Sequence, residues 1–365
     1  MIKLKEKTMK LFIPGPVTVS DNVLQKMAEP VIGHRSKDAS TLQKRITEKM
    51  QKLWNTDEMI LLSTSSGSGL MEGAIRSCTA KKAAVFSIGA FGKRWYQMAQ
   101  NNSVAADIFE ENLGDVTKAE QVDDVLKTGK YDLITITHNE TSTGVKNPIY
   151  EIAEAVKKYP DVVFCIDTVS STGGTDIDVN KLGADVLLTS SQKCLGLPPG
   201  LAICTFSKKA AEHAEHVKNR GYYLDLLNLY KYIFKKDYQY PSTPSISHMF
   251  ALDYKLDLIL NTEGKENRFA RHKILAEKVR NWAKEYFELF PKEEKNSSDT
   301  VTAIKNIRNI DVKDLNAELK KRGMQISNGY GELKEKTFRI AHMAETTVAD
   351  IDELLFNIND ILGLK

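Results

Sequence analysis

The residues between about 55 and 205 alternate short apolar runs with amphipathic stretches, and this alternation limits the possible folds more than any other feature. The apolar runs predict buried strands over 59–62, 83–88, 133–137, 162–166 and 186–189. The stretches between them have helical spacing over 71–78, 93–101, 121–126 and 150–158. Strands that alternate with helices build a mainly parallel sheet with both faces covered. The sequence therefore predicts an α/β fold.

The pattern changes after residue 262, where we expect a long charged helix over 265–289. A strand (301–305), a helix (312–322) and two further strands (324–327 and 337–341) are expected to follow it. Thr347 and Asp350 form a T-x-x-D pair, which marks the start of a last helix. We therefore predict three parts, namely an N-terminal segment (1–18), a large domain (19–262) and a small α+β domain (263–365).

Composition and charge disfavour several classes of protein. The 51 Lys and Arg residues nearly balance the 48 Asp and Glu residues, so no nucleic-acid partner is expected. No stretch approaches the roughly 20 apolar residues that cross a bilayer, and we expect neither a targeting signal nor a membrane partner. The four cysteines form no CxxC pair, which favours a reduced, cytoplasmic compartment. His213 and His216 lack the H-E-x-x-H pattern, so we expect no metal site.

Lys193 follows a buried strand in the segment DVLLTSSQKCLGLPPG, residues 185–200. Ligands of open α/β sheets bind at the carboxyl ends of the strands, and lysine is rarely buried there without a partner. Burial lowers the pKa of a lysine and makes its amine a nucleophile for carbonyl groups. This segment alone is equally compatible with a surface lysine.

Asp167 ends the apolar run VVFCID, at the end of the neighbouring strand along the chain. Taken alone, it is more simply the partner in a structural ion pair. Alternatively, it is the carboxylate that keeps a pyridine nitrogen protonated, which pyridoxal phosphate requires because its cationic ring takes up electrons.

The segment LLSTSSGSG leads from a strand into a helix and includes Ser66, Gly67 and Ser68. Free N–H groups at such a helix start bind anions. No P-loop lysine follows, and the glycines are spaced GxGxxxG, which is too long for a dinucleotide site. The segment alone is more simply an ordinary helix cap. An anion cradle, a carboxylate and a lysine on successive strand ends are together what pyridoxal phosphate requires.

These segments resemble class V aminotransferases of the pyridoxal-phosphate fold type I, near the alanine/serine–glyoxylate (serine–pyruvate) enzymes. The resemblance covers nearly the whole chain and rests on FIPGPVTVSDNV, GHRSKD, NETSTG, IDTVSSTGG, SSQKCLGLPPG, YPSTP and FRIAHMAETT. It implies a large domain with a mainly parallel seven-stranded sheet, a smaller α+β C-terminal domain, and pyridoxal 5'-phosphate as cofactor. It also implies a homodimer in which the two subunits share each site.

The resemblance also implies roles for the matching residues. Lys193 would form the Schiff base with the cofactor and then move the proton, and Asp167 would pair with the pyridine nitrogen. The remaining cofactor residues would be Ser66, Gly67, Ser68 and Gln192 at the phosphate, Phe91, Thr141 and Val169 at the ring, and Tyr240 and Thr243 from the partner subunit. Arg339 would hold the substrate carboxylate bidentately, although without the resemblance a surface ion pair is the simpler role. Gly15, His34 and Arg35 would lie near the substrate.

The implied reaction transfers an amino group from a small amino acid, alanine or serine, to a 2-oxo acid, glyoxylate or pyruvate. One alternative is an aminotransferase for a phosphorylated or phosphonate amine. Another is a pyridoxal-phosphate lyase or desulfurase, but Cys194 lies in a proline-bounded turn that does not suit a mobile nucleophile. The glycine spacing disfavours a nicotinamide-dependent oxidoreductase, and the presence of Lys193, Asp167 and Arg339 disfavours a non-catalytic subunit.

Overall fold

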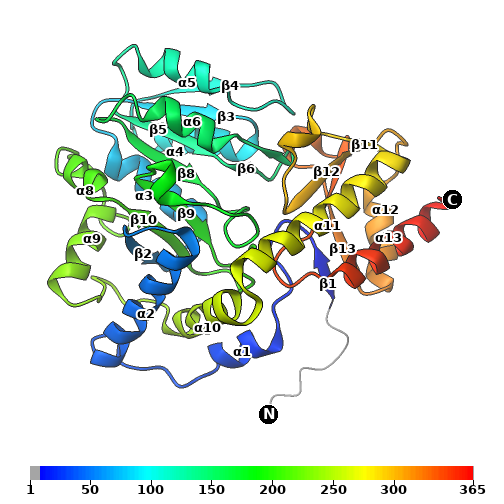
Figure 1. Ribbon diagram of the computed structural model, residues 1–365, viewed down its shortest axis with the longest axis horizontal. Helices are drawn as coiled ribbons and strands as arrows, with labels where there is room; N and C mark the ends of the chain where they lie inside the picture. Colours follow the sequence, from blue (N-terminus) through cyan, green and yellow to red (C-terminus); the bar gives the residue numbers. More distant parts are fainter. Residues whose placement is uncertain (1–8, 365) are drawn as a thin grey trace.

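The computed structural model describes residues 9–364 and contains one large and one smaller sheet (Figure 1). A third sheet consists only of β6 (Asn139–Glu140) and β7 (Val145–Lys146). The large sheet has seven strands in the order β2-β10-β9-β8-β5-β3-β4, and only β10 runs antiparallel to its neighbours. Its strands are β2 (Met59–Ser63), β3 (Ala83–Ser87), β4 (Ala106–Glu110), β5 (Leu133–Thr137), β8 (Val163–Asp167), β9 (Val186–Ser190) and β10 (Ala202–Phe206). This confirms the predicted α/β class with a mainly parallel seven-stranded sheet.

Two of these strands were missed from the sequence, for different physical reasons. Strand β4 lies at the edge of the sheet, and its residues ADIFE are half-buried or exposed, so they form no apolar run. Strand β10 is fully buried, but its residues AICTF directly follow the irregular turn of the lysine segment. Short apolar runs of this kind fit a strand and a buried helix equally well.

Helices pack against the large sheet and complete its core. The main ones are α2 (Lys37–Trp54), α3 (Gly67–Cys78), α4 (Ala90–Asn101), α5 (Ala119–Leu126), α6 (Ile149–Val156) and α8 (Lys208–Ala214). The shorter α1 (Asp21–Met27) and α7 (Val179–Leu182) and the pair α9 (Leu226–Lys235) and α10 (Ile246–Asp257) complete this part. All four cysteines are buried and unpaired.

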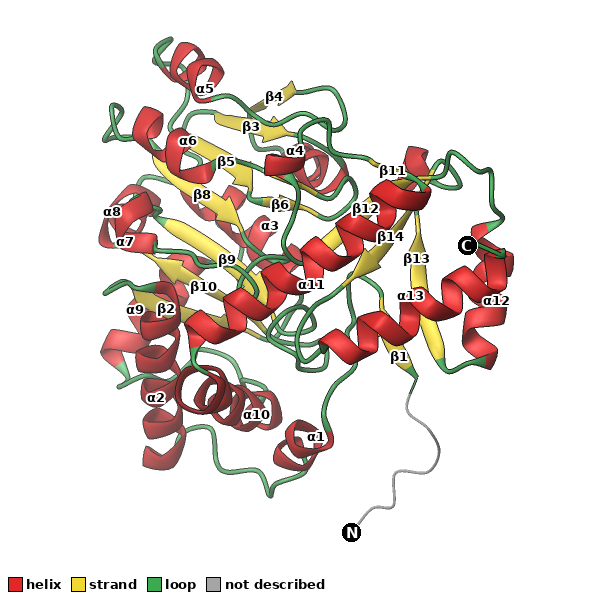
Figure 2. Cartoon of the chain, turned by 45° about the vertical axis from the view of Figure 1, so that its right-hand side comes forward, coloured by secondary structure: helices red, strands yellow, loops and turns green. Residues whose placement is uncertain are grey.

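The smaller sheet has five strands in the order β1-β13-β14-β12-β11. They are β1 (Lys10–Phe12), β11 (Glu288–Leu289), β12 (Val301–Lys305), β13 (Met324–Asn328) and β14 (Thr337–Ala341), and helices α11 (Lys265–Tyr286), α12 (Val312–Lys321) and α13 (Val348–Leu362) pack with them. Helix α13 begins at the predicted capping box, because Thr347 and Asp350 exchange side-chain and backbone bonds. In Figure 2, α11 crosses from the large sheet to the small one.

Strand β1 comes from the predicted N-terminal segment but pairs with β13 of the smaller sheet. The segment therefore adds an edge strand to that sheet, while residues 1–8 lie outside the described residues. The division into 1–18, 19–262 and 263–365 stays a prediction. Within residues 9–364, no helix combines the length and the apolar composition needed to cross a membrane.

Asp132, just before β5, joins three elements around the large sheet. Its carboxylate accepts hydrogen bonds from the backbone N–H groups of Ala80, Lys81 and Lys82 at 2.8–2.9 Å, and lies 3.1 Å from Nε2 of His213 on α8. Burial alone would raise the pKa of this carboxyl. The bonds from His213 and the three backbone groups outweigh it and hold the pKa below its ordinary value.

We predict that Asp132→Ala lowers the free energy of unfolding by about 2–3 kcal/mol at pH 7, because it leaves buried N–H groups without an acceptor. Since the folded-state pKa is lowered, the stabilisation is present above the unfolded pKa of about 3.9 and is lost as the pH falls through the folded value. Urea unfolding at pH 7 and at lower pH measures both effects. The exposed Asp161→Ala serves as control, and equal losses in the two variants would contradict the prediction.

Candidate active site

A cavity of about 230 Å³ lies beyond the carboxyl ends of β8 and β9. It is lined by Ser66, Gly67, Ser68, Met71, Phe91, Arg94, Asn139, Thr141, Asp167, Val169, Ser170, Ser190, Gln192 and Lys193. Every residue that the sequence placed at the cofactor within its own subunit lies in this lining. Because β8 and β9 are parallel neighbours, residues that follow each strand meet at one edge of the sheet.

Lys193 extends from the turn after β9 toward the N-terminal backbone. Its amine donates a hydrogen bond to the carbonyl of Pro14. A Cβ atom on Gly15, which has φ +90°, would lie 2.6 Å from Cδ of Lys193. Only glycine allows this close approach. Burial, the largest cause, and the positive charges of Arg339 and Arg94 together lower the pKa of Lys193 to about 8, against the opposing effects of Cys194 and Asp167.

Asp167 is the last residue of β8, and only 4% of its surface is exposed. Among the described residues, only the N–H of Val169 donates to its carboxylate, at 2.8 Å. Burial raises the pKa of Asp167 to about 6. A cationic partner in the cavity would hold this carboxyl ionised at neutral pH, since an opposite charge nearby favours the charged form.

The start of α3 lines one side of the cavity. Ser66 is the N-cap residue, but its side chain makes no capping hydrogen bond. A Cβ atom on Gly67 would lie 2.6 Å from Cγ2 of Val169, so the backbone approaches the cavity closely. Helix N-termini with free N–H groups favour phosphate.

Several polar atoms around the cavity are buried without a hydrogen-bond partner within residues 9–364. They are Oδ1 of Asn139, Oγ of Ser190 and Oε1 of Gln192. Unsatisfied buried polar groups are costly and rare in folded proteins, and a polar ligand would satisfy them. Together with the lysine, the carboxylate and the helix start, they fit a phosphorylated pyridine cofactor.

Arg339 reaches the site from β14 of the smaller sheet. Its guanidinium donates to the carbonyl of Thr141 at 3.1 Å and to that of Asn328 at 3.0 and 3.1 Å. The side chain lies just behind the cavity lining and packs against the ring of Tyr330, 5.6 Å from its centroid. Only 7% of the residue is exposed, so it is not part of a surface ion pair. Burial lowers the pKa of Arg339 to about 10.

Six predicted residues are not part of the cavity lining. Gly15 and Arg339 adjoin residues of the lining, and the other four lie elsewhere in the single chain. Tyr240 and Thr243 line a separate hollow, where the Tyr240 hydroxyl accepts a hydrogen bond from the N–H of Leu62 at 3.1 Å. Arg35 donates to the carbonyls of Tyr240 and Pro241, and His34 precedes it. Arg35 is thus engaged with the 240–241 backbone, and the expectation that His34 and Arg35 lie near the substrate stays a prediction. A site shared between two subunits stays a prediction.

Arg94 is a residue of the cavity that sequence reasoning missed. Its guanidinium lies 4.6 Å from the centroid of the Phe91 ring and donates to the hydroxyls of Ser68 at 3.2 Å and Tyr330 at 3.1 Å. No carboxylate lies within 4 Å of it in the described part of the chain. Helical spacing was an available signal, because residues three apart share a face and Phe91 was already a candidate.

Glu140, also missed, is fully buried beside the start of α4. Its carboxylate accepts the N–H groups of Phe91 and Gly92 at 3.0 Å and both the N–H and the hydroxyl of Ser142. The N-cap of α4 is Gly89, which has no side chain to fill this role. Glu140, the last residue of β6, therefore caps α4 from a distant part of the chain and fixes the backbone at Phe91.

Three comparisons relate the chain to known proteins. The family model for aminotransferase class-V matches residues 18–354. An uncharacterized aminotransferase of Methanocaldococcus jannaschii is 41% identical over 91% of this chain and 87% of its own length. L-aspartate–glyoxylate aminotransferase of Paracoccus denitrificans is 31% identical over 93% of this chain and 87% of its own length. The crystal structure of alanine–glyoxylate aminotransferase from Nostoc sp. is 26% identical, covers 99% of this chain and 97% of its own, and has a TM-score of 0.91.

The lowered pKa of Lys193 predicts how its amine reacts with an aldehyde. Only the uncharged amine is a nucleophile. The rate at which cofactor-free protein forms a Schiff base with pyridoxal phosphate should therefore rise with pH and level off above about 8. The visible absorbance of the product measures this rate, and Lys193→Ala should form no such band. A midpoint at about 10.4, the value of an ordinary lysine, would contradict the prediction.

Proposed function

The chain belongs to the class V aminotransferase family, and from this premise we propose that it transfers the amino group of alanine or serine to glyoxylate or pyruvate. Family membership establishes the coarser statement, which is pyridoxal-phosphate-dependent transamination between an amino acid and a 2-oxo acid. One observation carries the assignment of residues. Lys193, Asp167 and the start of α3 open into one cavity, and Arg339 lies directly behind it.

When bound, pyridoxal phosphate supplies an aldehyde that takes up amino groups and a cationic ring that withdraws electrons from the substrate. In our proposal Lys193 holds the aldehyde, Asp167 the ring nitrogen, and Ser66, Gly67, Ser68 and Gln192 the phosphate. Phe91, Thr141 and Val169 enclose the ring, and Glu140 keeps Phe91 in place. The unsatisfied atoms around the cavity support this arrangement.

Lys193 is also the base of the proposed reaction. Its amine Nζ takes the proton from the substrate Cα, because Lys193 is the residue of the lining that carries an amine. A pKa near 8 leaves part of the amine uncharged at neutral pH, and the best proton-transfer groups have a pKa close to the working pH. The charge of Asp167 keeps the ring nitrogen protonated during this step.

Arg339 orients the substrate by its carboxylate. Its buried guanidinium has carbonyl partners but no carboxylate within 4 Å among residues 9–364. A planar guanidinium binds a carboxylate through two parallel bonds, which fix direction as well as position. Since Arg339 belongs to the smaller sheet, both sheets contribute to the proposed site.

The desulfurase alternative receives no support from the surroundings of Cys194. Its thiol is fully buried and lies 3.7 Å from the carbonyl of Ser170. Burial raises the pKa of Cys194 to about 11. A desulfurase needs an accessible thiolate, and a buried thiol with a raised pKa is inert.

Addition of single amino donors to the cofactor-loaded protein tests the proposal. We expect alanine or serine to bleach the visible band, and glyoxylate, added next, to restore it with formation of glycine. Lys193→Ala should show neither change, because it lacks both the covalent link and the base. Unchanged absorbance with every donor, or full turnover by Lys193→Ala, would reject the proposed role of this lysine.

A second candidate donor class follows from the position of Arg94. Arg94 and Arg339 both contact Tyr330, one at its hydroxyl and the other at its ring face. The positive charges of both arginines lower the pKa of the Lys193 amine, so both guanidinium groups lie close enough to the amine to affect its charge. A donor with a second anionic group could pair with Arg94 while Arg339 holds its α-carboxylate. Aspartate is such a donor, and so is a phosphorylated or phosphonate amine.

This second candidate predicts that Arg94→Gln lowers kcat/KM for aspartate about tenfold relative to that for alanine, since a bond to a charged group contributes about 1.5–3 kcal/mol. The matched variant Arg339→Lys should weaken both donors to a similar extent, because both carry the α-carboxylate. Steady-state kinetics with the two donors measures the ratio. Equal losses for the two donors in Arg94→Gln would remove aspartate from consideration and leave Arg94 as a support for the cofactor phosphate.

A further inference from the structure

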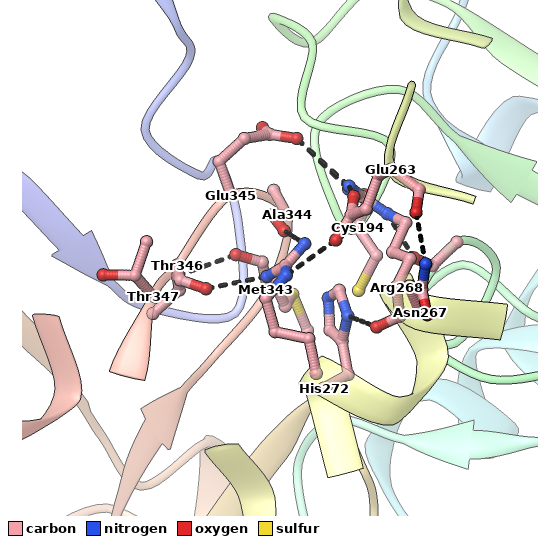
Figure 3. Close-up of polar contacts among 12 residues, drawn as sticks. Cys194, Glu263, Asn267, Arg268, His272, Met343, Ala344, Glu345, Thr346 and Thr347 are labelled. Carbon is pink, nitrogen blue, oxygen red and sulfur yellow. Dashed lines mark hydrogen bonds and ion pairs between the residues drawn. The ribbon is translucent and has the colours of Figure 1, made fainter. Parts of the chain in front are cut away.

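One buried arginine contacts the loops that follow three strands of the proposed site. Arg268 lies in the first turn of α11, and its side chain is 2% exposed. Figure 3 shows it between Cys194, Glu263 and Glu345. Arginine is rarely buried so deeply without a specific set of partners, and each of its contacts is therefore informative.

Two of the contacts are with the backbone on either side of the site. Nε of Arg268 donates to the carbonyl of Gly173 at 2.8 Å, and a terminal nitrogen donates to the carbonyl of Cys194 at 2.7 Å. Gly173 belongs to the loop that begins after Asp167, and Cys194 directly follows Lys193. The guanidinium is a rigid, planar fork, so these two bonds fix the two loops relative to each other.

The charge of Arg268 is balanced by two carboxylates. Glu263 accepts a hydrogen bond at 2.7 Å, and Glu345 lies 3.3 Å away. Glu345 also forms an ion pair with Lys255 of α10, and it lies in the loop after β14, the strand of Arg339. The contacts of Arg268 thus join the loops after β8, β9 and β14.

The loops themselves are packed with little free space. A Cβ atom on Gly174 would lie 2.6 Å from Cγ2 of Thr300, and one on Gly196 would lie 2.6 Å from Oε2 of Glu345. At these two glycines the loops therefore have little room to shift. The position of the guanidinium and the path of both loops therefore depend on each other.

We propose that Arg268 is a positioning residue that holds the Lys193 amine at the cavity by fixing the carbonyls of Cys194 and Gly173. The inference rests on the proposed role of Lys193. Buried ion pairs contribute little net stability, because the desolvation of both charges offsets their attraction. A defined loop geometry, rather than stability, is the effect that this arrangement provides.

Arg271 provides a matched control on the same helix. It donates to Glu263 at 2.8 Å, as Arg268 does, but its other bonds are to the carbonyls of Ala344 at 2.9 Å and Thr346 at 2.7 Å. Within the described residues, it donates no hydrogen bond to the loops that carry Lys193 and Asp167. Replacement of Arg271 by lysine therefore tests whether the loss of any guanidinium in this cluster slows the reaction of Lys193.

The test compares Arg268→Lys with Arg271→Lys, which both keep the positive charge but lose the fork. Cofactor-free protein is mixed with pyridoxal phosphate, and the rate of Schiff-base formation is followed by visible absorbance. We expect Arg268→Lys to react about tenfold to a hundredfold more slowly, since small misplacements of a reacting group have effects of this size. Arg271→Lys should react like the wild type. Thermal unfolding should be similar for both variants.

Equal rates in the two variants would overturn the inference while the proposed function stands, and a wild type that forms no Schiff base would reject both.

Glu345→Gln is a further control, because it removes a charge next to Arg268 but neither carbonyl contact. It should keep the wild-type rate. A rate as slow as in Arg268→Lys would indicate a general charge effect and also reject the inference. If Arg268→Lys does not fold, Arg268→Gln replaces it, because glutamine also lacks the fork that joins the two carbonyls. That variant should react more slowly than Arg271→Gln, and equal rates would reject the inference.

Discussion

The enclosure of a single amine, that of Lys193, organises the elements around the cavity. Strand β9 brings the residue to the sheet edge, and the N-terminal backbone closes over its stem, where Gly15 leaves room for it. Burial and two nearby guanidinium groups lower the pKa of this amine, so a larger fraction of it is uncharged than would be in water. An amine that is partly uncharged at neutral pH is what covalent binding of an aldehyde and proton transfer both require.

Some charged side chains around this amine have partners within the protein, and others are left for ligands. Asp167 and Glu140 are both buried carboxylates. Glu140 is satisfied by two N–H groups at the start of α4 and by the N–H and hydroxyl of Ser142, whereas Asp167 has a single donor and lines the cavity. Arg94 and Arg339 have no carboxylate within 4 Å in the described chain. One carboxylate and two guanidinium groups thus remain for a cofactor and a substrate, which agrees with a cationic ring and anionic groups on both ligands.

The site depends on contact between two sheets that lie far apart in the sequence. Arg339 of β14 donates to the carbonyl of Thr141, and Arg268 of α11 donates to the carbonyl of Cys194. In our proposal, these bonds fix the arginine that holds the substrate and the lysine that holds the cofactor, from distant parts of the chain. Side chains held by rigid elements keep a precise geometry better than side chains on free loops.

The sequence by itself determined the sheet strands with continuous apolar runs, the order of the lysine, carboxylate and anion-cradle segments, and the family. These features are local, because strand burial, helix capping and motif spacing depend on residues close together in the chain. Tertiary structure alone decided that β4 and β10 complete the sheet and that Tyr330 joins Arg94 to Arg339. It also decided that Glu140 caps α4, that Arg268 joins the loops, and that Tyr240 is bonded within its own chain. The physical reason is that a buried polar side chain finds its partner in space, and no periodicity in the sequence records which distant N–H or carbonyl that partner is.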